Sequence, residues 1–445
     1  AWRVAIDKQL VGTIKSVEER RKDKDYLVHG HVHNLYMWST LCLHRARTDF
    51  GRPELGAMAD DIFKEATAAM MPLGTWHENG GPVNVYDHVT AAGLSVYAEE
   101  TQAPWARAAL KRNLEFHSQF TYPDGTPVET VDGRVRYTHY PITILPPTWG
   151  TFSEGRGYVR AILKAALKTP FGGGDQPHGP WLGYPFVGEA LRFLPDDVMA
   201  DETWQPQAVY KAKSAEACMV RANPWTVSAA AICVPPLITQ RWWLARQNLV
   251  SAFHEKYGLI LGGGNSKELD FSTVVVHEKD GAIRYVPTVS EVEPAADKKG
   301  VTLKLTYGKT VVKVVLHTDD NSVKLTFALL EAGDAVAVFG QATLQPHNGN
   351  KLTWGKNSSA KLGDARIALS DYELTGKQME DEPTRAVLGW KDVAVALPNH
   401  SFVKWPLEPF NTHRVDNRYP PYKRVLGVQF PLPLKEPQTM TIQVK

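Results

Sequence analysis

Residues 122–140 read Tyr-Pro-Asp-Gly-Thr-Pro-Val-Glu-Thr-Val-Asp-Gly-Arg-Val-Arg-Tyr-Thr-His-Tyr, and the rest of the chain is organised on either side of this stretch. Pro123-Asp124-Gly125 and Asp132-Gly133 are turn signals, because Pro presets φ and Gly accepts a positive φ. The positions after the second turn are dense in ionisable and aromatic side chains: Arg134, Arg136, Tyr137, His139 and Tyr140. A loop of this kind is solvated or lines a cleft, so it is the first candidate for a functional site.

Upstream of this loop, and for some distance after it, the apolar residues follow helical spacing. Helices are expected over residues 29–47, 54–70, 85–99, 105–120, 157–168 and 181–194, with a Gly/Pro-rich loop over 169–180. Long loops between helices favour part of an α/α toroid over a compact bundle, whose connections are shorter.

From about residue 210 the apolar period changes to two. Residues 301–307 alternate as Val-Thr-Leu-Lys-Leu-Thr-Tyr, and further strands are expected at 311–316, 323–327, 335–339 and 439–444. Many short strands with turn signals between them predict an antiparallel sandwich. The predicted fold is therefore multi-domain, α then β. An incomplete N-terminal α/α toroid over residues 1–210 precedes an antiparallel β-sandwich over 211–445.

The composition argues against several classes of partner. Lys plus Arg (50) nearly balances Asp plus Glu (48), so no global field favours nucleic acid or an anionic membrane. No apolar run approaches the ~20 residues of a membrane span. Residues 1–25 are largely polar and end in a charge run, typical of a solvated helix face, so no signal peptide is visible. The 13 Trp residues fit either sugar-binding platforms or a large core.

Metal and cofactor sites are not expected. The 3 cysteines are too few and too scattered for a disulfide framework or a metal cluster. His29, His31 and His33 cannot all face one ion on a helix, so cleft-lining or capping roles are favoured. The segment 262–267, Gly-Gly-Gly-Asn-Ser-Lys, lacks the spacing of a phosphate-binding loop and is interpreted as a turn or strand exit.

One combination of residues indicates chemistry. His88 lies near the start of an expected helix, Tyr140 follows 52 residues later, and Arg134 precedes Tyr140 by 6. An adjacent guanidinium lowers the pKa of a phenol, and a nearby His can share its proton. A helix N-terminus can also hold a carboxyl group. The set suits proton removal α to a carboxylate, that is, β-elimination on a uronic acid; an ordinary buried Tyr-Arg-His cluster is the alternative interpretation.

The pattern Asp124-Gly-x-x-x-Glu129-x-x-x-x-Arg134-x-x-x-x-x-Tyr140 resembles a segment of the alginate-lyase and heparinase II/III-like polysaccharide lyases. In that superfamily an Asp-Gly turn is followed by Glu, Arg and the catalytic Tyr, and an Asn-His pair lies some fifty residues upstream. His88 occupies the place of that His. These lyases also join an α/α toroid to an antiparallel β-sandwich.

The resemblance implies a polysaccharide lyase that acts on a uronic-acid-containing glycan. Tyr140 would be the catalytic acid, and also the base if elimination is syn. Arg134 would tune Tyr140, and His88 would share proton transfer or neutralise the carboxyl group. The residues Tyr137, His139 and Trp149 are expected to line substrate subsites.

The sequence departs from the family pattern at two places. Asp87 stands where the family has Asn, with Asn84 one turn earlier. An ionised Asp would repel a uronate, so Asp87 is protonated, Asn84 takes its role, or the substrate differs. The histidine-rich signature of many related sandwiches is missing, and His254 is the nearest substitute, with residues 262–267 as the adjoining rim.

Two other functions fit the same sequence. A glycoside hydrolase on the same toroid would use paired carboxylates such as Asp87 and Glu154, and a carbohydrate-binding protein would keep the cleft without the chemistry. For the favoured lyase we expect no cofactor, an acidic polysaccharide or oligosaccharide as partner, and a secreted or periplasmic location.

Overall fold

The computed structural model describes residues 2–22, 33–78, 81–133, 140–168, 188, 192–193, 203–233, 248–263, 269–345, 387–390, 392–407 and 425–445. By its packing the chain divides into two compact units. The first holds residues 1–121, 125–127 and 140–206; the second holds 122–124, 128–139 and 207–445. The predicted domain division near residue 210 stays a prediction, because compactness does not show which segment folds alone.

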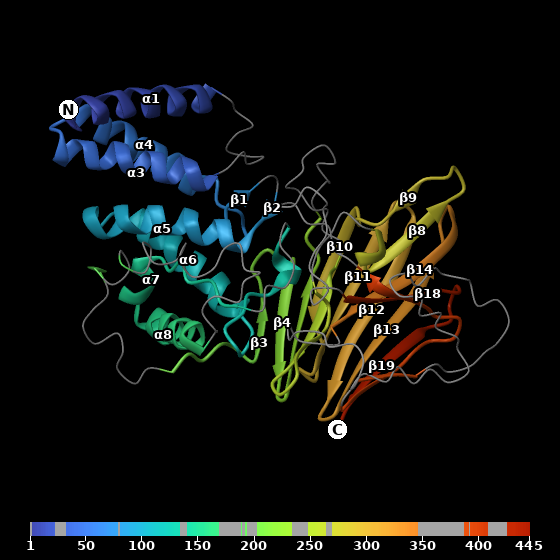
Figure 1. Cartoon of the computed structure of the whole chain (residues 1–445). Helices are drawn as coiled ribbons and strands as arrows, with labels where there is room; N and C mark the ends of the chain where they lie inside the picture. The colour runs from blue at the N-terminus through green and yellow to red at the C-terminus, as the bar shows by residue number, and fades with distance from the viewer. Residues whose placement is uncertain are drawn as a thin grey trace. The chain divides into compact units, whose positions relative to one another are not determined.

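The first unit is helical. Its described elements are α1 (Trp2–Lys22), α3 (His33–Asp49), α4 (Pro53–Ala68), α5 (Asn84–Thr101), α6 (Pro104–Gln119), α7 (Pro147–Thr151) and α8 (Ser153–Lys168), with a short hairpin of β1 (His77–Glu78) and β2 (Gly81–Pro82) before α5. Helix α3 packs on both α4 and α5, and α5 packs in turn on α6 and α7 (Figure 1). The predicted helices over 54–70, 85–99, 105–120 and 157–168 are confirmed with shifts of up to four residues at their ends. The one over 29–47 is confirmed from His33 onward, and residues 29–32 lie outside the described residues. Most of the expected helix 181–194 and the loop 169–180 lie outside the described residues.

Local sequence explains where these helices begin. Prolines occupy the first helical position of α4, α6 and α7, where a missing N–H costs nothing and the fixed φ already suits a helix. Helix α4 buries one apolar side that includes Leu55, Ile62 and Phe63. Helix α5 differs, because it buries polar as well as apolar side chains and lies between α3, α6 and α7. Buried polar groups need partners, so α5 is where a site is to be sought.

The second unit contains two antiparallel sheets among its described residues. The seven-stranded sheet runs β10 (Val289–Pro294), β11 (Gly300–Tyr307), β12 (Thr310–Asp319), β13 (Ser322–Glu331), β19 (Gln438–Val444), β16 (Val393–Ala396) and β15 (Val387–Trp390). The ten-stranded sheet runs β17 (Phe402–Leu407), β18 (Val425–Pro431), β14 (Ala335–Leu344), β7 (Gly258–Leu261), β6 (Val250–His254), β5 (Trp225–Ala230), β4 (Ala217–Ala222) and β3 (Val209–Lys211), with β8 (Val274–Glu278) on β14 and β9 (Ile283–Arg284) on β8.

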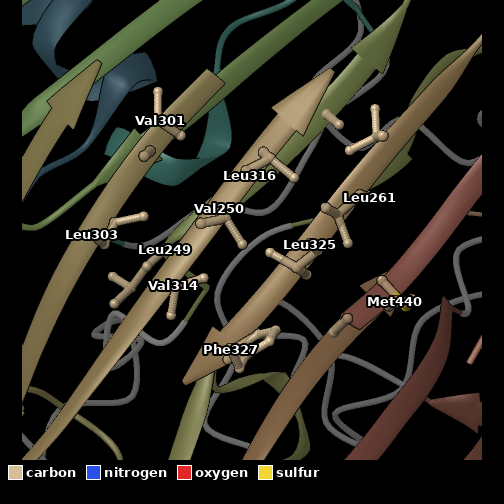
Figure 2. Packing of buried hydrophobic residues seen from close by; sticks show 14 of the residues in the cluster. Leu249, Val250, Leu261, Val301, Leu303, Val314, Leu316, Leu325, Phe327 and Met440 are labelled. Atoms are coloured by element: carbon tan, nitrogen blue, oxygen red, sulfur yellow. The ribbon is translucent and has the colours of Figure 1, made fainter. Parts of the chain in front are cut away.

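One apolar core joins the two sheets. Leu303 of β11 pairs with Val314 of β12, and alternate residues along these strands are buried. Figure 2 shows these side chains with Leu325 of β13, Val250 and Leu261, the last two from the ten-stranded sheet. Because both sheets contribute to one core, the unit is a β-sandwich. The predicted class, helices followed by an antiparallel sandwich, is confirmed. Among the described residues no helix is both long and apolar enough to span a membrane.

Candidate active site

The first turn of α5 carries the candidate residues of the helical unit. Asn84 is the first residue of the helix, and His88 lies four positions later, so both occupy one side of the helix. Asn84 is 3% exposed and His88 is 2% exposed. Asp87 lies between them in the sequence and also belongs to the first turn, where negative charge is favoured by the helix dipole.

Asp87 is directed into the protein. Its Oδ1 accepts a hydrogen bond from the backbone N–H of Trp76 (2.7 Å). Its Oδ2 accepts one from Asn113 Nδ2 (2.7 Å) and one from His117 Nε2 (2.6 Å). Asn113 and His117 lie on α6, so the carboxylate ties the start of α5 to α6 and to the loop before β1. Both oxygens are therefore engaged inside the helical unit.

His88 is held with a defined tautomer. Its Nδ1 lies 2.7 Å from the backbone oxygen of Ile144. Because a carbonyl oxygen only accepts, Nδ1 carries the hydrogen and Nε2 keeps its lone pair. Burial, followed by the nearby His117, lowers the pKa of His88 well below its ordinary value, so the ring is neutral near pH 7. A neutral ring in this tautomer accepts a proton at Nε2 and cannot donate one there.

His117 is the residue that the sequence analysis missed. Its ring lies 4.2 Å from that of His88, edge to face, and its Nε2 donates to Asp87. Burial lowers the pKa of His117 to about 3. The only sequence signal was its position on the apolar side of the helix over 105–120, where a core role was the simpler interpretation.

The Trp149 ring packs against the rings of His88 and His117. Its ring centroid lies 5.0 Å from that of His88 and 5.3 Å from that of His117. Ser95 of α5 fixes α7 at this place, because its Oγ accepts from the backbone N–H of Thr148 (2.7 Å). Trp149 is 0% exposed. In this structure Trp149 packs against His88, and the subsite role expected for it stays a prediction.

Tyr140 belongs to the same compact unit as His88 and is half-buried. It lies four residues before Ile144, whose carbonyl holds His88. Four residues of extended chain span at most about 14 Å, so Tyr140 is restricted to the neighbourhood of His88. Arg134, Tyr137 and His139 lie outside the described residues, and the roles expected for them stay predictions.

Glu129 occupies a separate polar cluster in the second unit. Its Oε2 accepts from the Tyr122 hydroxyl (3.0 Å) and its Oε1 from the backbone N–H of Gly263 (3.3 Å). Ser251 Oγ lies 2.7 Å from the Tyr122 hydroxyl and also forms a hydrogen bond with Glu129. Burial raises the pKa of Glu129 to about 7 in spite of these bonds. The motif in the sequence included Glu129 but indicated no role for it.

His254 also lies in the second unit, on β6. Its Nδ1 accepts from the backbone N–H of Lys256 (3.1 Å), and its ring packs edge to face on Trp225 at 4.6 Å. It is 6% exposed. Of the predicted rim 262–267, only Gly262 and Gly263 are described, and they follow strand β7 directly.

The carboxylate pair considered for a hydrolase is not arranged as an acid and a base. Glu154 lies at the exposed start of α8 and forms an ion pair with Lys111 (2.6 Å). This hydrogen bond lowers the pKa of Glu154, whereas a general acid needs a raised pKa. Asp87 is engaged by Trp76, Asn113 and His117.

Metal ligands do not gather in the part of the chain that the structure describes: no group of three or more His, Cys, Asp or Glu side chains could hold an ion there. The histidines His29 and His31 fall outside that part.

Several solved structures are similar to this chain at low sequence identity. The chondroitin AC lyase of Streptomyces coelicolor A3, in complex with chondroitin sulphate, matches 94% of this chain and 62% of its own, with 12% identity and a TM-score of 0.49. A structure of chondroitinase AC lyase from a study of enzyme–oligosaccharide complexes matches 93% and 61%, with 8% identity and a TM-score of 0.39. A heparinase III matches 91% and 66%, with 8% identity and a TM-score of 0.33.

These proteins are polysaccharide lyases, the class that the motif over residues 124–140 resembles. The chain spans less than two thirds of the length of each. At such identities and TM-scores the likeness assigns neither an activity nor catalytic residues to this chain. No protein-family model and no curated protein sequence matches it.

Proposed function

We propose that this protein is a polysaccharide lyase that cleaves a uronic-acid-containing glycan by β-elimination. The observation that supports it most is the state of His88: a neutral ring whose Nδ1–H is committed to the Ile144 carbonyl and whose Nε2 is left to accept a proton. This is the state that a general base requires. It does not suit a group that must donate a hydrogen bond to a carboxylate, which was the other role expected for His88.

In the proposed reaction His88 Nε2 takes the proton from C5 of the uronate. The electrons of the C5–H bond form the C4–C5 double bond, and the bond from C4 to the glycosidic oxygen breaks. Tyr140 donates its hydroxyl proton to that oxygen, and both residues later exchange protons with water. No redox cofactor takes part.

The carboxyl group of the substrate is assigned to Asn84 and not to Asp87. Asn84 lies at the N-terminus of α5, on the side of the helix that carries His88, and a neutral amide can donate to a carboxylate. Asp87 would repel the substrate charge, and its oxygens already accept from three protein donors.

A panel of uronate polysaccharides tests the function. A lyase leaves a C4–C5 double bond that absorbs in the ultraviolet, a hydrolase releases reducing ends without this absorbance, and a binding protein does neither. We expect absorbance to grow with at least one member of the panel. Release of reducing ends alone would replace the lyase by a hydrolase, and binding without cleavage would leave a carbohydrate-binding protein.

The variant His88→Asn examines the base directly. An Asn amide nitrogen takes the place of Nδ1 and keeps a donor for Ile144, but it has nothing in the place of Nε2. We expect kcat to fall by about 10²–10⁴-fold while the fold persists. His44→Gln, at a buried histidine that pairs with Glu100 on α5, is the matched control and should retain activity. Full activity in His88→Asn would exclude His88 as the base.

A further inference from the structure

Behind His88 lies a buried pair that the proposed chemistry does not use. Asp87 precedes His88 on α5, its side chain is 1% exposed, and it accepts from His117 at 2.6 Å. The ring of His117 in turn lies edge to face against His88, with centroids 4.2 Å apart. A continuous path of contacts therefore leads from a carboxylate to the proposed base without passing through the substrate.

A base buried in this way faces an energetic difficulty. When His88 takes a proton, its ring becomes a cation at a position that is 2% exposed, and an unpaired buried charge is strongly disfavoured. The described groups that face His88 are the Ile144 carbonyl, the rings of His117 and Trp149, and the carboxylate of Asp87. Among these, Asp87 alone carries negative charge.

The surroundings of Asp87 are built to keep it in place. Three N–H donors, from Trp76, Asn113 and His117, meet its two oxygens at 2.6 to 2.7 Å. Asn113 is itself fixed, because its Nδ2 also donates to the backbone oxygen of Gly74 (2.9 Å). Donors of this number and geometry complement an ionised carboxylate, and they come from α6 and from the loop before β1.

We propose that Asp87 and His117 are positioning residues that act through His88: Asp87 supplies the negative charge that stabilises the imidazolium, and His117, bonded to Asp87, holds the His88 ring in register. This deepens the proposed function and rests on it. The proton abstracted from the substrate stays on His88 Nε2, and Asp87 remains ionised throughout.

Two variants separate the parts of this pair. Asp87→Asn removes the charge and keeps the size, so the pKa of His88 should fall further, and kcat should fall by roughly ten- to a hundredfold with KM within about twofold of wild type. His117→Gln keeps an amide donor for Asp87 and removes the ring that contacts His88. It should lower kcat and let the His88 ring move away from the Ile144 carbonyl that fixes its tautomer, so that both tautomers are populated. His44→Gln, remote from this cluster, is the control for loss of a buried histidine.

The readout that a purely structural role would not change is the protonation of His88, followed by nitrogen-15 NMR of the labelled, full-length protein. A His88 titration and tautomer that stay at their wild-type values in both variants would overturn the proposal. A KM that changes in Asp87→Asn at unchanged kcat would also overturn it, because Asp87 would then act on substrate binding and not through His88. If Asp87→Asn fails to fold, the titration and tautomer of His88 in His117→Gln test the proposal.

The NMR measurement needs no substrate. If no polysaccharide yields absorbance, the lyase function fails while the coupling between Asp87 and His88 is still measured. If absorbance is found and the pKa of His88 is the same in both variants as in wild type, the lyase function is supported. The proposal that Asp87 and His117 position His88 is then wrong.

Discussion

At the scale of single residues, the state of His88 determines how the protein should respond to pH. The lowered pKa of His88 leaves the ring unprotonated in mildly acidic solution. Activity that depends on a neutral base is lost only as pH falls through the pKa of that base. We therefore expect the acid limb of kcat/KM to lie below the ordinary histidine value of about 6.5. A pH–rate profile with its acid limb at or above that value would contradict this state of His88.

Glu129 should make the stability of the protein depend on pH in the opposite sense from an ion-paired carboxylate. Its folded pKa of about 7 lies above the ordinary value of 4.5, so the folded state holds a proton that the unfolded state releases. The bound proton stabilises the folded state by on the order of 3 kcal/mol. This contribution to the free energy of unfolding is fully present below about pH 4.5 and is lost as pH rises through 7.

The variant Glu129→Gln mimics the protonated carboxyl group and cannot ionise. Its free energy of unfolding, measured by denaturant titration, should change less between pH 5 and pH 8 than that of wild type. Glu331→Gln, at an exposed carboxylate of β13, controls for the substitution itself. Parallel curves for wild type and Glu129→Gln across this window would show that Glu129 does not titrate there.

Residue roles were only partly predictable from the sequence. The position of His88 near a helix start was predictable from the pattern, and its role stays a prediction. The orientation of the Asp87 side chain was not predictable, because it depends on hydrogen bonds from Asn113 and His117 of another helix. Trp149 was expected to line a subsite because it follows Tyr140 in the same loop, and sequence alone did not show that it is 0% exposed.

At the scale of elements, the turn that follows β7 is constrained by Glu129. Gly262 has φ +106°, and a Cβ placed on it would lie 2.7 Å from Ser251 Cβ and 2.8 Å from Glu129 Oε1. Gly281 also has positive φ (+86°) but has no heavy atom within 4 Å of such a Cβ. Both positions therefore have a backbone conformation that would strain a residue with a side chain, and they differ in the space around the added Cβ.

We expect Gly262→Ala to lower the free energy of unfolding by about 3 kcal/mol and Gly281→Ala by about 1 kcal/mol. The larger loss reflects displacement of Glu129 and Ser251 in addition to the cost of positive φ. Chemical denaturation of both variants measures the difference. Equal losses would mean that strain alone makes Gly262 necessary.

Element boundaries were predictable wherever one periodicity dominates. Helix α4 and strand β11 lie within two residues of their expected limits, whereas β12 and β13 extend three and four residues beyond their expected ends. The place of the central loop was not predictable. Residues 128–133 belong to the second unit, where the Thr130 hydroxyl forms a hydrogen bond with the Ser228 hydroxyl (2.6 Å). A loop carries no period from which such a partner can be inferred.

At the scale of the whole molecule, helices followed by a sandwich could be predicted from the change of apolar period near residue 210. Local periodicity and turn residues specify such elements without knowledge of their partners. The site depends instead on contacts between distant segments, such as Ile144 with His88, which lie 56 residues apart. Chemistry therefore follows from the sequence less completely than architecture does.

The most direct test of the account is ultraviolet absorbance on a cleavable uronate polysaccharide, with wild type beside Tyr140→Phe. The variant removes one hydroxyl group and keeps the ring, so it removes the proposed acid with little change in packing. We predict that absorbance grows with wild type and falls by at least about 10²-fold in Tyr140→Phe. Absorbance that grows at the wild-type rate in Tyr140→Phe would contradict the assignment of Tyr140 as the acid.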